Sequence, residues 1–205
     1  MKLYGATPSP FFRKCRVVLE EKGISYETEN IIPVPKTAEL LALNPIGKIP
    51  ILRDGDVVVP DSSVICLYLE KKYPLPSVYP SDPAEYARAL FLEEYADTKL
   101  AEVLGGIFFE RFVKPNVLKQ TPDEARVQGL LEREVPPVMA YVESQVPKER
   151  ETLLSRFSIA DAALGGQLGS LSFAGVEIDA ARWPRTARYY RALLSRPSFK
   201  TTLAG

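Results

Sequence analysis

The chain has 205 residues, with 26 basic and 26 acidic side chains, two cysteines and no histidine. A formal net charge of zero with interleaved signs argues against nucleic-acid binding, which needs Lys and Arg concentrated on one face. Two cysteines without histidine offer neither a zinc site nor a disulfide framework. No stretch approaches the roughly 18 consecutive apolar residues of a membrane span. The amino terminus carries no apolar signal region, so we expect a reduced, cytoplasmic setting.

The absence of histidine also limits the chemistry. Histidine is the usual general base because its pKa lies close to neutral pH. Any reaction must therefore use a serine, a tyrosine, a lysine, a carboxylate, or a substrate that brings its own nucleophile.

A proline-rich segment divides the chain. Residues 74–83 carry four prolines in ten positions, too many for a helix or a central strand. We therefore predict an amino-terminal domain over residues 1–76, a linker over 77–83 and a second domain over 84–205.

The first part alternates between strand and helix patterns. Apolar residues at helical spacing follow Pro10 and stop at Gly23, and Asp54-Gly55 between two short apolar runs predicts a β-hairpin. The order predicts a small mixed sheet covered by helices, with its first two strands parallel because a helical crossover joins them. The predicted strands are 2–4, 26–31, 49–53 and 57–59, and the predicted helices are 10–22, 37–43 and 62–73.

The second part contains no convincing strand pattern. Four helices are predicted, and Pro136-Pro137 should kink or split the second of them. The expected architecture is an all-helical bundle. The predicted helices span 84–118, 122–145, 158–173 and 184–194.

Ser9 stands where the first strand pattern has ended and the first helix begins. Its hydroxyl is expected beside the free N–H groups of the helix start, which favour an anion. An ordinary N-cap serine explains the same pattern without any ligand. This segment alone leaves both interpretations open.

Two other segments are ambiguous in the same way. The run 44–52 reads Asn-Pro-Ile-Gly-Lys-Ile-Pro-Ile-Leu, in which Pro50 is either a cis bend beside a ligand or a trans edge-strand proline. Asp61 and Ser62 precede an apolar helix and are either a capping pair or a grip for an amino-acid group. In the second case the serine and the helix start hold the carboxylate, and the aspartate holds the ammonium.

Together these motifs resemble those of the glutathione transferase family, over essentially the whole chain. The resemblance implies an α/β thioredoxin-like amino-terminal domain followed by an all-α helical-bundle carboxy-terminal domain. It also implies glutathione as co-substrate, no metal, and a homodimer that binds no nucleic acid and no membrane. The motifs in register are Ser9-Pro10-Phe11, 44–50, Asp61-Ser62, a capping box over 157–161, and the closing helices over 183–199.

Ser9 occupies the position of the family's serine that hydrogen-bonds the glutathione sulfur. The ordinary pKa of a thiol is about 8.5. Lowering it by about two units requires interactions that favour the thiolate over the thiol by roughly 2.7 kcal/mol. The interaction with the helix dipole and one hydrogen bond from a hydroxyl are together strong enough to supply this free energy. In this hypothesis the thiolate attacks an apolar electrophile bound against the helical domain.

The resemblance also implies which residues bind the rest of glutathione. Asp61 and Ser62 match the pair that grips the γ-glutamyl group, although the family more often has Glu than Asp at the first position. Lys48 should lie near the glycyl carboxylate, with Lys36 a weaker candidate. Ile49 should offer its backbone to the cysteinyl part, next to a cis Pro50.

Aromatic residues on the long helix indicate an apolar electrophile site, although plain inter-helix core explains most of them equally well. Gly105 and Gly106 are expected to leave room beside them. The candidate lining residues are Phe11, Leu104, Phe108 and Phe112.

The remaining reactive or charged residues near the first helix receive structural interpretations. Ser9 and Phe12 stand where a dithiol protein would have its two cysteines, so dithiol chemistry is excluded there. Cys15 and Cys66 are interpreted as small buried hydrophobes. Arg13 and Lys14 are expected on a solvated face.

Two functional alternatives stay open. The chain could be a non-catalytic binding or interaction module of the same fold, or a specialised glutathione-dependent isomerase, peroxidase or dehalogenase. The sequence does not separate these, because substrate choice depends on apolar residues of the second domain.

Overall fold

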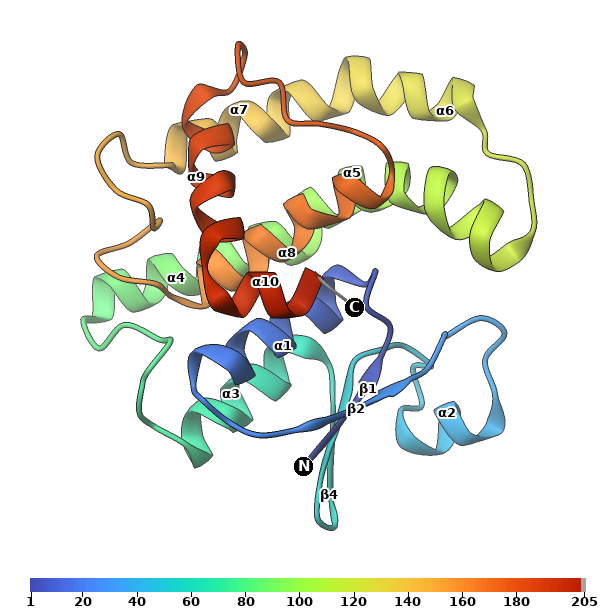
Figure 1. Ribbon diagram of the computed structural model, residues 1–205, viewed down its shortest axis with the longest axis vertical. Helices are drawn as coiled ribbons and strands as arrows, with labels where there is room; N and C mark the ends of the chain where they lie inside the picture. The colour runs from blue at the N-terminus through green and yellow to red at the C-terminus, as the bar shows by residue number, and fades with distance from the viewer. Residues whose placement is uncertain (204–205) are drawn as a thin grey trace.

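The computed structural model describes residues 1–203; the last two residues of the predicted second domain lie outside the described part. Its amino-terminal part holds a four-stranded sheet in the order β2-β1-β3-β4 (Figure 1). β1 and β2 are parallel, as predicted, and β3 is antiparallel to both of its neighbours. The strands are β1 (Lys2–Gly5), β2 (Glu27–Asn30), β3 (Ile51–Asp54) and β4 (Val57–Pro60).

Helices cover both faces of this sheet. α1 (Pro10–Glu21) and α3 (Ser62–Lys72) lie on one face, and the short α2 (Ala38–Leu43) lies on the other (Figure 1). Successive strand residues point to opposite faces, so Leu3 joins the main core while Tyr4 packs with Leu40 in a small second cluster. The mixed sheet between helices is the predicted arrangement, and the fold class is confirmed.

The carboxy-terminal part is helical throughout its regular elements. Each of the two longest predicted helices is divided by π-helical stretches, and Pro136 falls in the first turn of α7, where a missing N–H costs nothing. The predicted split at that point is therefore confirmed. The elements are α4 (Pro83–Tyr95), η1 (Ala96–Leu100), α5 (Ala101–Phe108), η2 (Phe109–Leu118), α6 (Glu124–Gly129), η3 (Leu130–Glu134), α7 (Val135–Gln145), α8 (Ile159–Phe173), α9 (Pro184–Ser195) and α10 (Pro197–Leu203).

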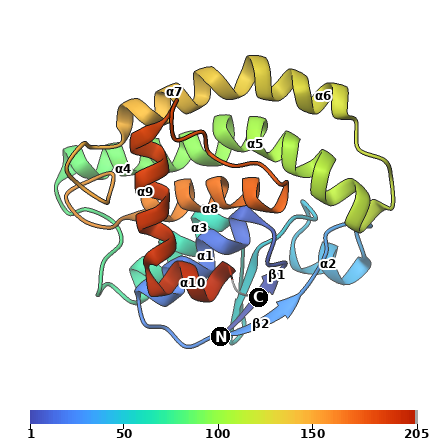
Figure 2. The ribbon, with the colours of Figure 1, turned by 45° about the horizontal axis from the view of Figure 1, so that its top comes forward.

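The two parts meet where α1 packs against α8, which lies between α1 and α5 (Figure 2). Glycines on α8 permit the close approach, since a Cβ on Gly166 would lie 2.9 Å from the Pro10 carbonyl oxygen. A Cβ on Gly106 would lie 2.9 Å from Leu130, so that glycine serves packing and not the ligand space we predicted. One hydrophobic core therefore runs from β1 to α10.

Residues 1–203 contain neither a candidate membrane span nor a candidate metal cluster. None of the helices described is both long and apolar enough to cross a membrane. In the same residues, no group of three or more His, Cys, Asp or Glu side chains is placed to hold a metal ion.

Candidate functional site

Several predicted site residues lie on segments that meet at one end of the sheet. Tyr4, near the end of β1, pairs with Ile51 at the start of β3, and Ile51 pairs with Pro60 at the end of β4. Gly5 pairs with Asn30, the last residue of β2. The loops after β1, β2 and β4 and the segment before β3 therefore emerge together. The predicted site residues on these segments are Ser9, Lys36, Lys48, Ile49 and Asp61.

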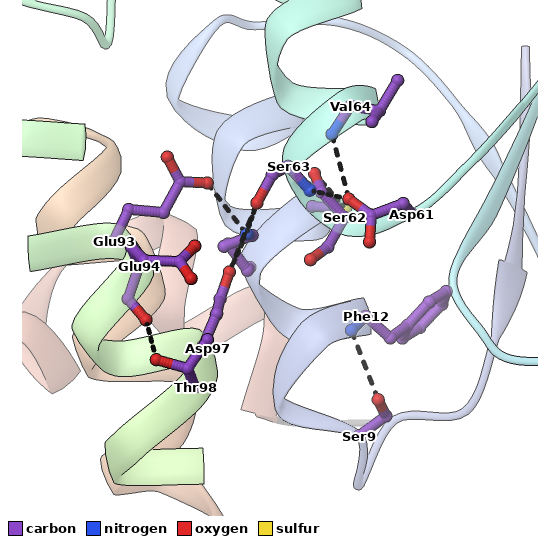
Figure 3. A network of polar contacts seen from close by, with 12 residues as sticks. Ser9, Phe12, Asp61, Ser62, Ser63, Val64, Glu93, Glu94, Asp97 and Thr98 are labelled. Carbon is purple, nitrogen blue, oxygen red and sulfur yellow. Dashed lines mark hydrogen bonds and ion pairs between the residues drawn. The ribbon is translucent and has the colours of Figure 1, made fainter. Parts of the chain in front are cut away.

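Ser9 caps the start of α1. Its Oγ accepts a hydrogen bond from the Phe12 N–H at 3.4 Å, and its backbone is extended at φ −70° and ψ 123° (Figure 3). The side chain is half-buried, and within residues 1–203 its hydroxyl donates no hydrogen bond. Because the oxygen is used as an acceptor, the hydroxyl hydrogen is free to donate to an anion at the helix start, where the dipole favours negative charge.

Asp61 caps the start of α3 in the same way. One carboxylate oxygen accepts hydrogen bonds from the N–H groups of Ser63 at 2.9 Å and Val64 at 3.2 Å (Figure 3). The side chain is exposed, and its second oxygen accepts no hydrogen bond within the described residues. Its φ of 77°, with ψ at 135°, lies in a region that few residues other than glycine adopt. Ser62, the next residue, is buried at 5% exposure.

Asn44 shapes the loop that leads into β3. The Asn44 amide donates to the Lys48 carbonyl at 2.9 Å and accepts from the Ile46 N–H at 3.0 Å. Gly47 has a φ of +68°, and a Cβ there would lie 2.6 Å from the Lys36 side chain, which crosses the loop and donates to the Ile46 carbonyl at 2.9 Å. The Lys48 ammonium, in contrast, is exposed and makes no bond within residues 1–203.

Pro50 lies just before β3, and the Ile49–Pro50 peptide bond is cis, as predicted. Pro50 is buried and Ile49 is half-buried. Within the described chain, the N–H and carbonyl of Ile49 form no backbone hydrogen bond. This leaves them able to pair with a peptide-like ligand.

The prediction of a solvated face at Arg13 and Lys14 is wrong, because the two side chains are 0% and 1% exposed. The helix α1 is covered by α8 and α10, elements far away in sequence that the pattern of α1 itself does not reveal. Both cations therefore lie at the junction of the two parts of the molecule.

Lys14 is the centre of a buried polar network. Its ammonium donates to Glu93 at 2.9 Å and to the Ser63 hydroxyl at 2.9 Å, and it pairs with Asp97. Figure 3 shows these three partners. Burial lowers the pKa of Lys14, but the charges of Asp97 and Glu93 outweigh burial and raise it above its usual value. The network ties α1 and α3 to α4 and η1.

Cys15 and Cys66 are free, buried thiols, which confirms their interpretation as small hydrophobes. Burial raises the pKa of Cys15 well above its ordinary value. A thiol that stays protonated at neutral pH is a poor nucleophile. The Cys15 thiol instead donates a hydrogen bond to the Ser62 carbonyl at 3.6 Å, and this bond joins α1 to the start of α3.

An aromatic cluster lies where η2 follows α5. The rings of Phe108 and Phe112 stack at 5.1 Å, and Phe173 at the end of α8 meets Phe112 edge-on at 5.4 Å. Leu104 is fully buried, so it offers no surface to a ligand. Phe11 is half-buried and, among the described residues, forms no aromatic pair with this cluster.

Sequence reasoning missed four residues, three in the Lys14 network and one in the aromatic cluster. Glu93 and Asp97 stand at i and i+4, a spacing that places two carboxylates on one helix face and could have indicated a buried partner cation. Ser63 directly follows the predicted acid-serine pair and carried no signal of its own. Phe173 reaches the aromatic cluster only through tertiary packing.

Comparison with known proteins identifies the family. The model of the glutathione S-transferase N-terminal domain matches residues 3–77. A probable glutathione S-transferase, GSTF2 of Oryza sativa subsp. japonica, is 31% identical over 97% of this chain and 93% of its own length. A stringent starvation protein A homolog of Pasteurella multocida (strain Pm70) is 28% identical over 99% of this chain and 90% of its own. The chain belongs to the glutathione S-transferase family.

Solved structures agree with this assignment. A glutathione S-transferase from Rhodospirillum rubrum F11 matches with a TM-score of 0.91 and 27% identity, covering 100% of this chain and 92% of that one. A glutathione S-transferase from Methylobacterium radiotolerans JCM 2831, solved in complex with glutathione sulfonate, matches with a TM-score of 0.80 and 31% identity over 98% of this chain and 93% of that one. The family resemblance and the two-part fold it implied are confirmed.

Proposed function

We propose that this protein is a glutathione transferase in which Ser9 stabilises the thiolate of bound glutathione for addition to a hydrophobic electrophile. The observation that carries the proposal is the state of the Ser9 hydroxyl. Its oxygen is held by the Phe12 N–H at the start of α1, while its hydrogen is unused within residues 1–203. A charge-assisted hydrogen bond and a helix dipole at the same point favour a sulfur anion without any histidine.

The same proposal assigns the rest of glutathione to groups with unused bonding capacity. The free oxygen of Asp61 holds the γ-glutamyl ammonium, and Ser62 with the start of α3 holds its carboxylate. The backbone of Ile49, next to Pro50, pairs with the cysteinyl part. Lys48, helped by Lys36, attracts the glycyl carboxylate.

The electrophile is proposed to bind beside the aromatic cluster at the end of the first long helix. Phe108 and Phe112 are half-buried there and offer ring faces, and Phe11 adds a further aromatic side chain from α1. Leu104 is fully buried and is removed from the predicted lining.

Replacing the capping serine tests the central step. Ser9→Ala is expected to raise the pKa of the bound glutathione thiol by roughly 1 to 2 units, because one charge-assisted hydrogen bond is lost. Ultraviolet titration of the thiolate in the binary complex measures this value. Asp82→Ala is the matched control, since Asp82 caps α4 through the N–H groups of Ala84 and Glu85. An unchanged thiol pKa in Ser9→Ala would refute the role of Ser9.

A second candidate is a non-catalytic interaction module of the same fold. It is favoured by the 28% identity to a stringent starvation protein A homolog, whose name carries no transferase activity. Retention on immobilised glutathione followed by an assay with a reactive aryl halide separates the two. Retention with turnover supports the transferase, and retention without turnover supports the module.

The homodimer and the cytoplasmic location expected from the sequence belong to this proposal. Exposed apolar side chains on α3 and α4 support self-association, among them Val64 at 51%, Leu67 at 44% and Phe91 at 55% exposure. Sedimentation of the full chain measures the oligomeric state. Conjugation, isomerisation, peroxide reduction and dehalogenation all use the same thiolate, so activity assays must distinguish among them.

A further inference from the structure

Arg13 and Lys14 are neighbouring cations on α1 with opposite electrostatic surroundings. Lys14 meets two carboxylates, Glu93 at 2.9 Å and Asp97. Within residues 1–203 the Arg13 guanidinium forms no ion pair, and its hydrogen bonds go only to carbonyl oxygens. The charge of Lys14 is therefore neutralised where it lies, and the charge of Arg13 is not.

Burial makes the charged state of Arg13 energetically unfavourable. The side chain is 0% exposed, and it donates to the Gly166 carbonyl at 2.7 Å and to the Thr7 carbonyl at 3.3 Å. Its buried Nε has no hydrogen-bond partner in the described chain. An unpaired buried charge has a large desolvation free energy. The Phe173 ring, 5.2 Å from the guanidinium, offsets only a part of it through a cation–π interaction.

The groups around Arg13 do not cancel its charge. Burial lowers the pKa of Arg13 to about 10, so the guanidinium stays protonated at neutral pH. From α9 it faces Tyr190, whose own pKa burial raises, so that the phenol is neutral at that pH. Along α1 the neighbouring charge is the cation Arg16. From α8 it meets the Gly166 carbonyl and the uncharged Phe173 ring, and a Cβ on Gly169 would lie 2.6 Å from Nη1.

The contact with Thr7 places this charge beside the proposed site. Thr7 belongs to the turn between β1 and α1, two residues before Ser9, and the Ser9 N–H donates to the Ala6 carbonyl within that turn. A cation that is not screened by water acts over a longer distance than one at the surface. The guanidinium can therefore act on a sulfur anion at the start of α1 without touching it.

We propose that Arg13 is a positioning residue for the glutathione thiolate: it fixes the turn that carries Ser9 through the Thr7 carbonyl, and its unneutralised charge adds to the positive potential at the start of α1. The inference rests on the proposed function, because the thiolate is that of bound glutathione. It gives a reason why, within residues 1–203, one buried cation is paired with carboxylates and its neighbour is not.

Three variants of the full chain separate the charge of Arg13 from its hydrogen bonds. Arg13→Met removes both, and is expected to raise the pKa of bound glutathione thiol by about 1 unit, measured by ultraviolet titration. The activity with an aryl halide should fall roughly tenfold below that pKa and recover at higher pH. Arg13→Lys keeps the charge and should restore most of the thiol pKa, but it should raise KM because a compact ammonium lacks the fork with which Nη1 and Nη2 reach the two carbonyls. Arg16→Gln is the control, since it removes an adjacent cation that bonds Tyr26 and the carbonyls of Thr201 and Thr202.

The outcomes decide between this inference and the function on which it rests. A folded Arg13→Met variant that binds glutathione with an unchanged thiol pKa overturns the role of Arg13, even where Ser9→Ala still shifts that pKa. If Arg13→Met does not fold, Gly169→Ala decides instead, because its Cβ displaces Nη1 while every charge is kept. A rise of the thiol pKa in Gly169→Ala that is smaller than the roughly 1 unit expected for Arg13→Met supports the inference, and an unchanged thiol pKa overturns it. A wild-type chain that binds no glutathione overturns both proposals together.

Discussion

The start of α8 and the starts of α1 and α3 use the same capping chemistry in opposite surroundings. At α8, Ser158 and Asp161 are both 0% exposed and form the reciprocal cap predicted from the sequence. The Asp161 carboxylate accepts hydrogen bonds from the N–H groups of Leu153 and Ser158 and from the hydroxyl of Tyr189, each at 2.9 Å. No oxygen of this cap is left for a ligand.

At α1 and α3 the caps keep unused capacity. Ser9 has a free hydroxyl hydrogen and Asp61 a free carboxylate oxygen within residues 1–203, and both side chains reach the surface. A buried cap with every bond satisfied stabilises the fold, whereas an accessible cap with a spare bond can bind a ligand. The two kinds are distinguished by burial and saturation, not by residue type.

The sharpest test of this contrast is to remove the buried cap. Asp161→Ala is expected to lower the free energy of unfolding by about 3 to 5 kcal/mol, because four buried donors lose their acceptor. Equilibrium unfolding in urea measures the loss. Asp82→Ala, which removes the exposed cap of α4, should cost only about 1 kcal/mol. Equal losses in the two variants would contradict the distinction.

The pH dependence of the same cap gives a second test. Burial raises the pKa of Asp161 to about 6 from an ordinary value of 3.8, and its hydrogen bonds oppose burial without cancelling it. As the pH rises from about 4 to about 6, the unfolded chain gives up this proton first, so the stability due to Asp161 falls across that window and is constant above it. The unfolding free energy of the wild type relative to Asp161→Asn should fall by on the order of 3 kcal/mol between pH 4 and pH 7. A difference that stays level or rises would mean that the hydrogen bonds outweigh burial.

The accessible cap of α3 should show the reverse pattern, with the smallest effect on stability. Asp61→Asn keeps an oxygen for the N–H groups of Ser63 and Val64, and the two side chains have nearly the same shape. Unfolding is therefore expected to change by less than about 0.5 kcal/mol. The lost charge should weaken glutathione binding roughly 10- to 100-fold, measured by titration calorimetry. Unchanged affinity would remove the proposed ammonium contact.

Local sequence was sufficient to predict most of the elements and the three caps. Helical spacing after Pro10, the Asp54-Gly55 turn and the proline-rich segment each depend on neighbours in sequence, and the structure has all three. The starts of α1 and α3 were found for the same reason, since a cap is set by residues within one turn. The strand β2 is one residue shorter at each end than predicted, and β3 begins two residues later than predicted, since Pro50 cannot donate to a sheet.

What the sequence did not predict depends on contacts between distant segments. Arg13 and Lys14 look like surface cations until α8 covers α1, and Leu104 looks like a pocket residue until the bundle closes around it. The division of the long helices into α-helical and π-helical stretches likewise has no local signal apart from Pro115, which lies inside η2. Burial by a partner far along the chain is a property of the packed molecule.

The Lys14 network has a consequence for how this chain can be rearranged. Ser63 comes from the first half of the molecule, whereas Glu93 and Asp97 come from the second. A fragment that ends in the proline-rich segment would expose the apolar face of α1 that α8 covers and would leave Lys14 without both acids, so the halves should melt in a single transition and not one after the other. A chimaera that joins this first half to the second half of a relative needs acidic residues at the positions of Glu93 and Asp97. Lys14 and these two acids must therefore be kept together in any such exchange.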